Sequence, residues 1–321
     1  MILSEPLKIN NKILRNRIVM PPTATRKAEN GGPNYEQIEY YKKRAVGTGL
    51  IIVEHAYVSP EGMASIGQLS MADDSIISAY QKLTDAVHQE GALILAQISH
   101  AGSYAKTMGE KIAPSAYAFK DGMNLPKEIT KDDIKRIVKC FADASIRAKK
   151  AGFDGVEIHS AHGYLLTQFY SPLTNKRTDE YGFQNLESRT KIHREIIRAI
   201  RESAGSNFIL ALRFGGCDYM EGGSKIEDIP KASKIFEDDG IDLLDISGGL
   251  CAYTLKENNN PGWFADSSKA AKNAVNIPVI LTGGIKTKED AEKFLIDGAC
   301  DLVGIGREMM KNPNWPKEAL A

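Results

Sequence analysis

The strongest constraint on the fold is a series of eight short apolar runs, each of a length suited to one β-strand. The runs occupy residues 17–22, 49–58, 92–99, 153–159, 208–214, 241–247, 278–282 and 301–306. Segments with helical periodicity separate them, at residues 35–45, 75–89, 131–150, 187–203, 226–238, 267–274 and 288–296. Strand and helix therefore alternate along nearly the whole chain, as in α/β proteins with parallel strands.

Eight such units predict a closed (β/α)8 TIM barrel that occupies residues 1–321 as a single domain. A length of 321 residues also suggests two domains, but α/β barrels commonly reach this size as one. A doubly wound open sheet is the alternative fold, and about six strands are usual for it.

Composition and charge exclude several classes of function. Lys plus Arg and Asp plus Glu both number 41, so net charge provides no general attraction to nucleic acid or to an anionic membrane. The strongest apolar run, residues 50–53, is too short to cross a membrane, and the N-terminus lacks the pattern of a signal peptide. The four cysteines form no CxxC pair, which favours reduced thiols over a metal site. We therefore expect a cytoplasmic protein that acts on a small molecule.

Polar and glycine residues mark the carboxyl ends of the predicted strands, the face on which barrel enzymes carry their chemistry. They are Gln97, His159, Arg213, Ser247, Gly283, Gly284, Gly306 and Arg307. The glycines after strands seven and eight predict a phosphate site, because backbone N–H groups in these loops commonly bind phosphate. Arg307 would add a charge-assisted hydrogen bond. The alternative is that these glycines are only turn residues.

The segment His159-Ser-Ala-His162-Gly-Tyr164 has three interpretations. A metal site is one, although the segment lacks the HExxH pattern and a nearby cysteine. Solvated loop histidines are the second. The third is a pair of imidazole N–H donors to the carbonyl oxygen of an enone, where charge develops during hydride attack, with Tyr164 as the acid that protonates the α-carbon. Gln97 and Arg213 in the same predicted site favour the third.

Gln97 and Arg213 suit the pyrimidine edge of an isoalloxazine ring. That edge offers donors and acceptors that an amide can match, and a cation stabilises the negative charge that reduction places near N1 and the C2 oxygen. The alternative for Arg213 is a buried salt bridge inside the barrel, with Glu54 or Glu157 as its partner.

A set of longer motifs covers nearly the whole chain, at residues 15–22, 49–54, 97–102, 113–116, 151–165, 171–182, 213 and 304–308. The most specific are HSAHGYL at 159–165 and RTDEYG at 177–182. In these motifs and their order the chain resembles the Old Yellow Enzyme family of NADH:flavin oxidoreductases, and within it the short single-domain bacterial ene-reductases.

The resemblance implies non-covalent FMN, NADH or NADPH as hydride donor, and ping-pong reduction of the activated C=C bond of α,β-unsaturated carbonyl compounds. It implies His159 and His162 as donors to the carbonyl oxygen and Tyr164 as the proton donor. The cofactor-binding residues that it implies are Pro21, Pro22, Thr23, Ala24, Gln97, Arg213, Gly283, Gly284, Gly306 and Arg307. Because relatives are often dimers or tetramers, we also expect a homo-oligomer.

Three departures from the family pattern carry expectations of their own. Ala24 stands where Cys or Thr usually lies beside the flavin C4 oxygen, so a side-chain hydrogen bond is absent there. Ser103 stands where many short members have Arg, which predicts different substrate and nicotinamide contacts. The sequence ends at Ala321, whereas longer relatives continue into a cysteine cluster and further domains, so we expect no iron–sulfur electron transfer in this chain.

The alternative function is a flavin-free, phosphate-binding barrel that acts as a lyase or isomerase. Such an enzyme would be expected to carry a lysine or metal-binding carboxylates at the inner strand ends, which the sequence does not show. Other FMN barrels lack the loop from His159 to Tyr164. A barrel that binds flavin without catalysis is disfavoured by the same three side chains.

Overall fold

Eight parallel strands close into a barrel in the computed structural model, which describes residues 1–107, 109–119, 124–255 and 260–321. The strands are β3 (Ile18–Met20), β4 (Leu50–Tyr57), β6 (Leu93–Ser99), β9 (Gly155–Ser160), β10 (Ile209–Phe214), β11 (Leu243–Ile246), β12 (Val279–Thr282) and β13 (Leu302–Gly304). Pairing of β3 with both β4 and β13 closes the ring. The predicted TIM barrel is confirmed, and each predicted strand overlaps an observed one.

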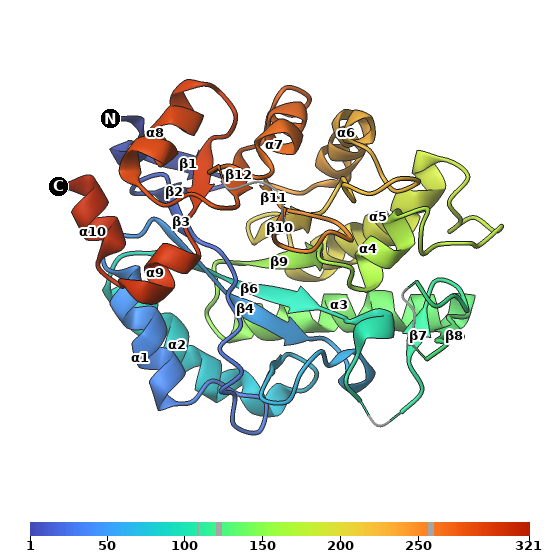
Figure 1. Ribbon diagram of the computed structural model, residues 1–321. Helices are drawn as coiled ribbons and strands as arrows, with labels where there is room; N and C mark the ends of the chain where they lie inside the picture. Colours follow the sequence, from blue (N-terminus) through green and yellow to red (C-terminus); the bar gives the residue numbers. More distant parts are fainter. Residues whose placement is uncertain (108, 120–123, 256–259) are drawn as a thin grey trace.

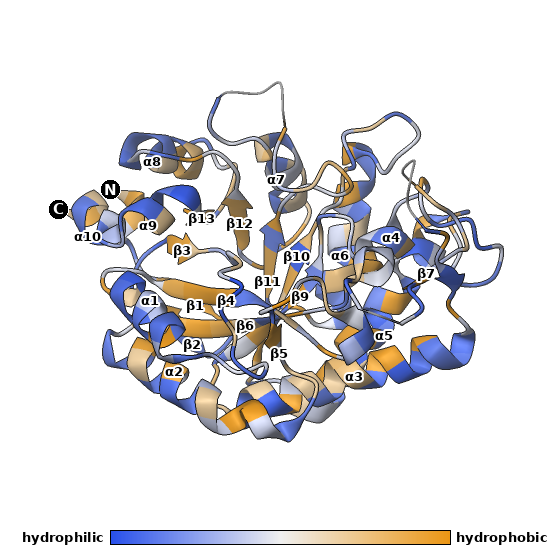
Figure 2. Ribbon diagram, turned by 60° about the horizontal axis from the view of Figure 1, so that its bottom comes forward, coloured by the Kyte–Doolittle hydropathy of each residue, from blue (hydrophilic) through white to orange (hydrophobic). Residues whose placement is uncertain are grey.

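Helices surround the barrel and connect successive strands (Figure 1). The long ones are α1 (Tyr35–Ala45), α2 (Ile77–Gln89), α3 (Lys131–Lys150), α5 (Leu186–Ala204), α6 (Ile229–Asp239), α7 (Ala265–Lys272) and α8 (Lys288–Ile296). Helices α1, α3 and α8 have the predicted bounds, because each begins at a capping box, formed by Asn34, Thr130 and Thr287. Outer helices such as α3 carry both polar and apolar residues, whereas the barrel strands are mostly apolar (Figure 2).

Several short elements were not expected from the sequence. They are the strands β1 (Leu7–Ile9), β2 (Lys12–Leu14), β5 (Leu69–Ser70), β7 (Ile112–Ala113) and β8 (Lys127–Glu128), the helices α4 (Leu165–Tyr170), α9 (Arg307–Lys311) and α10 (Trp315–Leu320), and the 3-10 turns η1 (Ile2–Ser4), η2 (Pro60–Gly62) and η4 (Gly102–Tyr104). Two further 3-10 turns, η3 (Asp74–Ile76) and η5 (Ile226–Asp228), lie at the start of the helices predicted at 75–89 and 226–238. None is long enough to show a clear hydrophobic period. The segment 102–128 contains η4, β7 and β8, and the described residues of the segment 248–263 form no helix or strand. Residues 108, 120–123 and 256–259 in these segments lie outside the described part.

The barrel encloses its own small apolar core. Its members are Ile9, Leu14, Val19, Leu50, Ile52, Leu95, Ile209, Ala211, Leu243, Ile280 and Leu302. The hairpin formed by β1 and β2 closes the amino-terminal end of the barrel, where Asn10 Nδ2 donates to Asp242 Oδ1 at 3.1 Å just before β11. A larger apolar cluster packs the outer strand faces against the helices. The carboxyl ends of the strands are therefore free to carry polar side chains.

The cysteines are free thiols, as expected from their spacing. Burial raises the pKa of Cys217 to about 11 and that of Cys300 to about 12, so these thiols stay protonated near neutral pH. Within the described residues, no helix is both long and apolar enough to cross a membrane.

Candidate active site

Strand register brings polar side chains from four neighbouring strands to one level of the barrel. Arg213 of β10 lies between His159 of β9 and Asp245 of β11, and Gln97 of β6 is opposite Glu157 of β9. Residues two apart on a strand face the same side, so Gln97, Arg213 and Asp245 each continue an inward row that begins with an apolar residue of the barrel core, at positions 95, 211 and 243. A polar layer therefore covers the apolar core at the carboxyl ends of the strands.

Two acids and one guanidinium form this layer. Gln97 Nε2 donates to Glu157 Oε1 at 2.8 Å, and Arg213 Nε lies 3.3 Å from Asp245 Oδ2. Burial, followed by the charge of Asp245, raises the pKa of Glu157 well above its ordinary value, and burial raises the pKa of Asp245 to about 6. Glu157 therefore keeps its proton near neutral pH, and Asp245 provides the negative charge that faces Arg213.

The buried salt bridge considered for Arg213 is present, but its partner is Asp245 rather than Glu54 or Glu157. Glu157 is occupied by Gln97, and Glu54 accepts hydrogen bonds from Thr25 instead. Arg213 Nε faces Asp245 and is buried without a hydrogen bond, and the terminal nitrogens of the guanidinium make none within the described residues, so these terminal nitrogens are the donors left for the cavity.

A cavity of about 700 Å³ opens above the polar layer. Every residue that the sequence assigned to the site borders it: Pro21, Pro22, Thr23, Ala24, Gln97, His159, His162, Tyr164, Arg213, Gly283, Gly284, Gly306 and Arg307. These residues come from six different strand ends and loops, and the closed barrel brings them together. Ser103 is not among the residues that border the cavity; it is buried in η4, where its N–H donates to Gln168 Oε1 at 3.2 Å.

Two histidines and a tyrosine cluster on one wall of the cavity. The ring centroid of His159 lies 5.0 Å from that of His162 and 4.9 Å from that of Tyr164. Burial lowers the pKa of both histidines well below the ordinary value, so both are neutral near pH 7 and each carries one N–H. Burial raises the pKa of Tyr164, with Arg26 opposing the shift, so its hydroxyl keeps its proton. Among the described residues, no three His, Cys, Asp or Glu side chains could hold a metal ion.

Sequence reasoning missed His55, which joins this cluster from β4. Its ring centroid lies 5.5 Å from that of Tyr164, and its Nδ1 lies 2.9 Å from Gln68 Nε2. Burial is the main reason that the pKa of His55 is lowered to about 4, with the charges of Arg26 and Arg213 adding to it. The available signal was its place near the end of an apolar strand, the same signal that identified His159. Arg26, Tyr253 and Trp263 also border the cavity and were not expected there.

At one end of the cavity, called here the glycine end, the backbone of Gly283 and Gly284 carries no side chains. Gly283 and Gly284 have φ values of +118° and +71°, and a Cβ on Gly284 would lie 2.8 Å from the Trp263 ring. The Arg307 guanidinium lies 4.6 Å from the centroid of the same ring. The indole Nε1 of Trp263 is buried without a hydrogen-bond partner. The glycine backbone, the Arg307 cation and the unpaired N–H of Trp263 together fit a phosphate group. The unused donors of Arg213 at the other end of the cavity fit a flavin ring.

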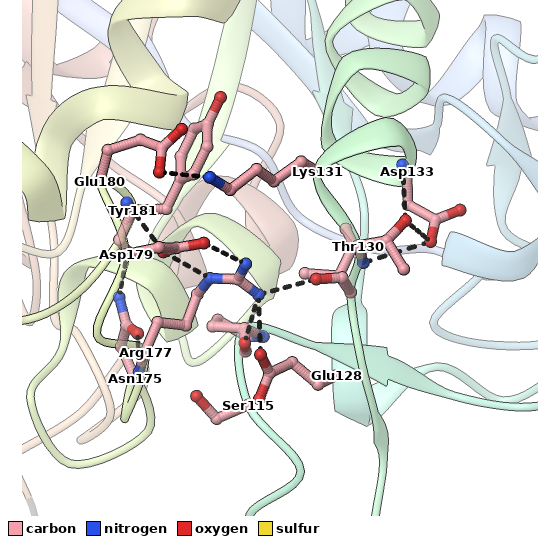
Figure 3. Close-up of polar contacts among 12 residues, drawn as sticks. Ser115, Glu128, Thr130, Lys131, Asp133, Asn175, Arg177, Asp179, Glu180 and Tyr181 are labelled. Carbon is pink, nitrogen blue, oxygen red and sulfur yellow. Dashed lines mark hydrogen bonds and ion pairs between the residues drawn. The ribbon is translucent and has the colours of Figure 1, made fainter.

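The RTDEYG motif lies outside the cavity and holds two loops together (Figure 3). Arg177 Nη1 donates to the carbonyl oxygens of Pro114 at 3.0 Å and Ile129 at 2.7 Å, and its other nitrogens contact Asp179 at 3.0 and 2.6 Å. Asp179 Oδ1 also accepts the N–H of Tyr181 at 3.1 Å. One of the two most specific motifs is therefore structural.

The fold and the site together define a barrel oxidoreductase built to hold a phosphorylated flavin. The chain belongs to the NADH:flavin oxidoreductase / NADH oxidase family, whose sequence profile matches residues 2–320. The resemblance to the Old Yellow Enzyme family is confirmed, and with it FMN as the cofactor and NAD(P)H as the hydride donor at the level of the family.

Two curated relatives are similar over the whole chain. The NADH oxidase of Thermoanaerobacter brockii is 41% identical over 97% of this chain and 50% of its own length. The metal reductase of Desulforamulus reducens is 38% identical over 100% of this chain and 49% of its own length. The chain thus spans about half the length of these relatives.

Solved structures resemble the barrel closely. A 2-naphthoyl-CoA reductase complex superposes with a TM-score of 0.93 at 29% identity, over 99% of this chain and 52% of the other. The Old Yellow Enzyme homologue from Zymomonas mobilis superposes with a TM-score of 0.87 at 27% identity, over 99% of this chain and 92% of the other. A morphinone reductase mutant in complex with tetrahydroNAD gives 0.87 at 25% identity, over 99% and 90%.

Proposed function

We propose that this chain is an FMN-dependent NAD(P)H oxidoreductase that reduces the activated C=C bond of α,β-unsaturated carbonyl compounds in a ping-pong reaction. The observation that carries the proposal is the convergence of His159, His162 and Tyr164 on a cavity that also contains Gln97 and Arg213. Two imidazole N–H donors and a tyrosine hydroxyl on the wall of a cofactor-sized cavity are the groups that conjugate hydride addition requires.

The cofactor would be held along the length of the cavity. Pro21 to Ala24 would line the ring, Gln97 and Arg213 would meet its pyrimidine edge, and Gly283, Gly284, Gly306 and Arg307 would hold the phosphate. When bound, FMN supplies a centre that takes hydride from a nicotinamide and returns it to an alkene carbon. Ala24 has no side-chain group to hydrogen-bond the ring, so Arg213 would be the main polar influence from the protein.

Substrate orientation would depend on the two neutral histidines. Each imidazole has one N–H to donate to the carbonyl oxygen, and fixed donors in a partly buried site stabilise the charge that develops there. Tyr164 would deliver its hydroxyl proton to the α-carbon of the substrate. A tyrosine kept protonated by burial can do so without a carboxylic acid nearby.

The absorption spectrum of the purified protein tests the proposal. We expect a flavin band that bleaches on anaerobic addition of NADH or NADPH and returns on addition of cyclohexenone. A colourless protein that does not bind added FMN would contradict it and favour the phosphate-binding lyase or isomerase. A flavin that is bleached but not restored by any enone would keep the cofactor and overturn the substrate class.

Three further proposals accompany the catalytic one: a single domain over residues 1–321, a homo-oligomer of two or four chains, and a cytoplasmic location. The barrel strands run from β3 to β13 with one enclosed core, which supports the first. Light scattering on the FMN-loaded protein would test the oligomer, since a monomer at micromolar concentration would contradict it.

A further inference from the structure

Two permanent positive charges border the histidine and tyrosine end of the cavity: Arg213, which pairs with Asp245, and Arg26. Arg26 borders the cavity together with Ala64 and Ser65. It lies close enough to affect two neighbours: the pKa of His55 is lowered first by burial and next by Arg26, and the burial-raised pKa of Tyr164 is partly offset by Arg26. The guanidinium is therefore near the group proposed to protonate substrate.

Arg26 has no acidic partner in the described residues, in contrast to the cation beside it. Lys27 Nζ pairs with Glu36 Oε2 at 2.7 Å, whereas no described carboxylate lies within ion-pair distance of Arg26. The acidic residue that borders the cavity is Glu308, which pairs with Lys311 at 3.0 Å near the glycine end. The histidines of the cavity are neutral, so within the described part of the chain the exposed guanidinium of Arg26 is paired with no negative charge and is free to meet an anion in the cavity.

The backbone of Arg26 is held in an unusual conformation. Its φ of +59° is in the left-handed region, which is rare for residues other than glycine. The buried carboxylate of Glu54 accepts the N–H of Arg26 at 3.3 Å and the N–H of Thr25 at 2.7 Å. Glu54 also accepts from Gln37 of α1 at 3.1 Å, so the segment is tied to the barrel. A conformation retained in this way at a cavity wall suggests a function for the side chain that it presents.

We propose that Arg26 binds a carboxylate of the substrate, so that the preferred substrates are α,β-unsaturated carbonyl compounds that carry a negative charge. The inference rests on the proposed function and narrows its substrate class. A guanidinium at the wall can form two parallel hydrogen bonds to a carboxylate while the carbonyl oxygen meets the histidines. The substrate's anion would also supply the partner that Arg26 lacks within the protein.

A pair of substrates tests the charge. 4-Oxopent-2-enoate and its methyl ester share one enone, and the difference in alkene activation between acid and ester cancels when the wild type and a variant are compared. We expect Arg26→Gln to lower the ratio of kcat/KM for acid over ester by about tenfold relative to the wild-type holoenzyme. Arg26→Lys should recover part of that ratio, because lysine keeps the positive charge but cannot form two parallel hydrogen bonds to the carboxylate. Lys27→Gln is the control, since Lys27 does not border the cavity and should leave the ratio unchanged.

Equilibrium binding gives a second readout that needs no turnover. Calorimetry on the oxidised holoenzyme with 4-oxopentanoate and its methyl ester should show the same loss of about tenfold for the acid in Arg26→Gln. The rate of flavin reduction by NADH and by NADPH checks whether Arg26 instead binds a phosphate of the dinucleotide.

The outcomes separate the two proposals. If the wild-type enzyme turns over both compounds and Arg26→Gln leaves the acid-to-ester ratios unchanged, the inference is overturned while the function stands. A slower reduction by dinucleotide with unchanged ratios also overturns it. If neither these compounds nor cyclohexenone reoxidises the reduced wild-type enzyme, the proposed function fails, and the calorimetric ratio alone decides whether Arg26 binds the carboxylate.

Discussion

Ser247 Oγ lies 2.8 Å from Nε2 of His162, so one ring nitrogen of this histidine is engaged within the protein. A hydroxyl that donates to Nε2 leaves the single proton of the neutral imidazole on Nδ1. His162 has a φ of +59°. Ser247, at the end of β11, therefore engages Nε2, and Nδ1 is the ring nitrogen left to meet a ligand.

Removing this hydroxyl should weaken carbonyl binding. We expect Ser247→Ala to raise the Kd of cyclohexenone for the oxidised holoenzyme about fivefold, as for the loss of a neutral hydrogen bond. Ser268→Ala is the matched control, because Ser268 Oγ donates to the Ala299 carbonyl at 2.7 Å away from the cavity. Equal Kd values for Ser247→Ala and the wild type would mean that His162 does not depend on Ser247.

Tyr164→Phe should separate the two halves of the catalytic cycle. Flavin reduction by NADH should be nearly unchanged, whereas reoxidation by cyclohexenone should slow about 10²-fold or more, the usual effect of losing a general acid. Stopped-flow absorbance follows each half separately. Tyr117→Phe, on a side chain outside the cavity, serves as the control. Equal slowing of both halves would show that Tyr164 positions the ligand or the ring rather than donating a proton.

Gly284→Ala should weaken cofactor binding through a clash at the glycine end. Its Cβ would lie 2.8 Å from the Trp263 ring, at a φ of +71°. We expect the Kd for FMN to rise about tenfold, since forcing one extra carbon into a packed site typically costs about 1–3 kcal/mol. Gly298→Ala has a similar φ of +63° but open space around it, so its Kd should match that of the wild type. Fluorescence titration of FMN measures both.

Arg177→Met should destabilise the fold without altering the cavity. Arg177 is buried and satisfies two carbonyl oxygens as well as Asp179. We expect the free energy of unfolding in urea to fall by about 3 kcal/mol, as when a buried ion pair loses one partner. Lys131→Met removes the exposed pair with Glu180 and should change little. An Arg177→Met protein with wild-type stability and lost activity would move the motif into the catalytic machinery.

His193 should contribute to acid sensitivity. Burial lowers its pKa in the folded protein to about 3, whereas an unfolded histidine has a pKa of about 6.5. Between these values the unfolded chain binds the extra proton, so stability falls as the pH decreases through this window. In His193→Gln, the slope of unfolding free energy against pH should be smaller by about 1.4 kcal/mol per pH unit between about pH 6 and about pH 4. An unchanged slope would place the proton uptake at other buried histidines.

The barrel was predictable because its strands are buried on both faces and read as continuous apolar runs. The site was predictable for the same reason: a polar residue such as Arg213 at the end of such a run is conspicuous. The register that pairs Arg213 with Asp245 depends on barrel closure and was not predictable from local sequence. Arg26 was missed because its placement depends on a left-handed φ and on the distant carboxylate of Glu54.

The apolar core inside the barrel is also a region of low dielectric constant. Leu50, Leu95 and Leu243 belong to the apolar core beneath the charged groups of Arg213 and Asp245, and the β1–β2 hairpin covers the opposite end of that core. Because the apolar core has a low dielectric constant, the electric field of a charge in the polar layer extends mainly toward the polar cavity rather than into the core. The electrostatic potential at the cavity therefore responds to single-charge changes in the layer below it, so substitutions of Asp245 or Glu157, which do not border the cavity, should act on redox chemistry without touching a ligand.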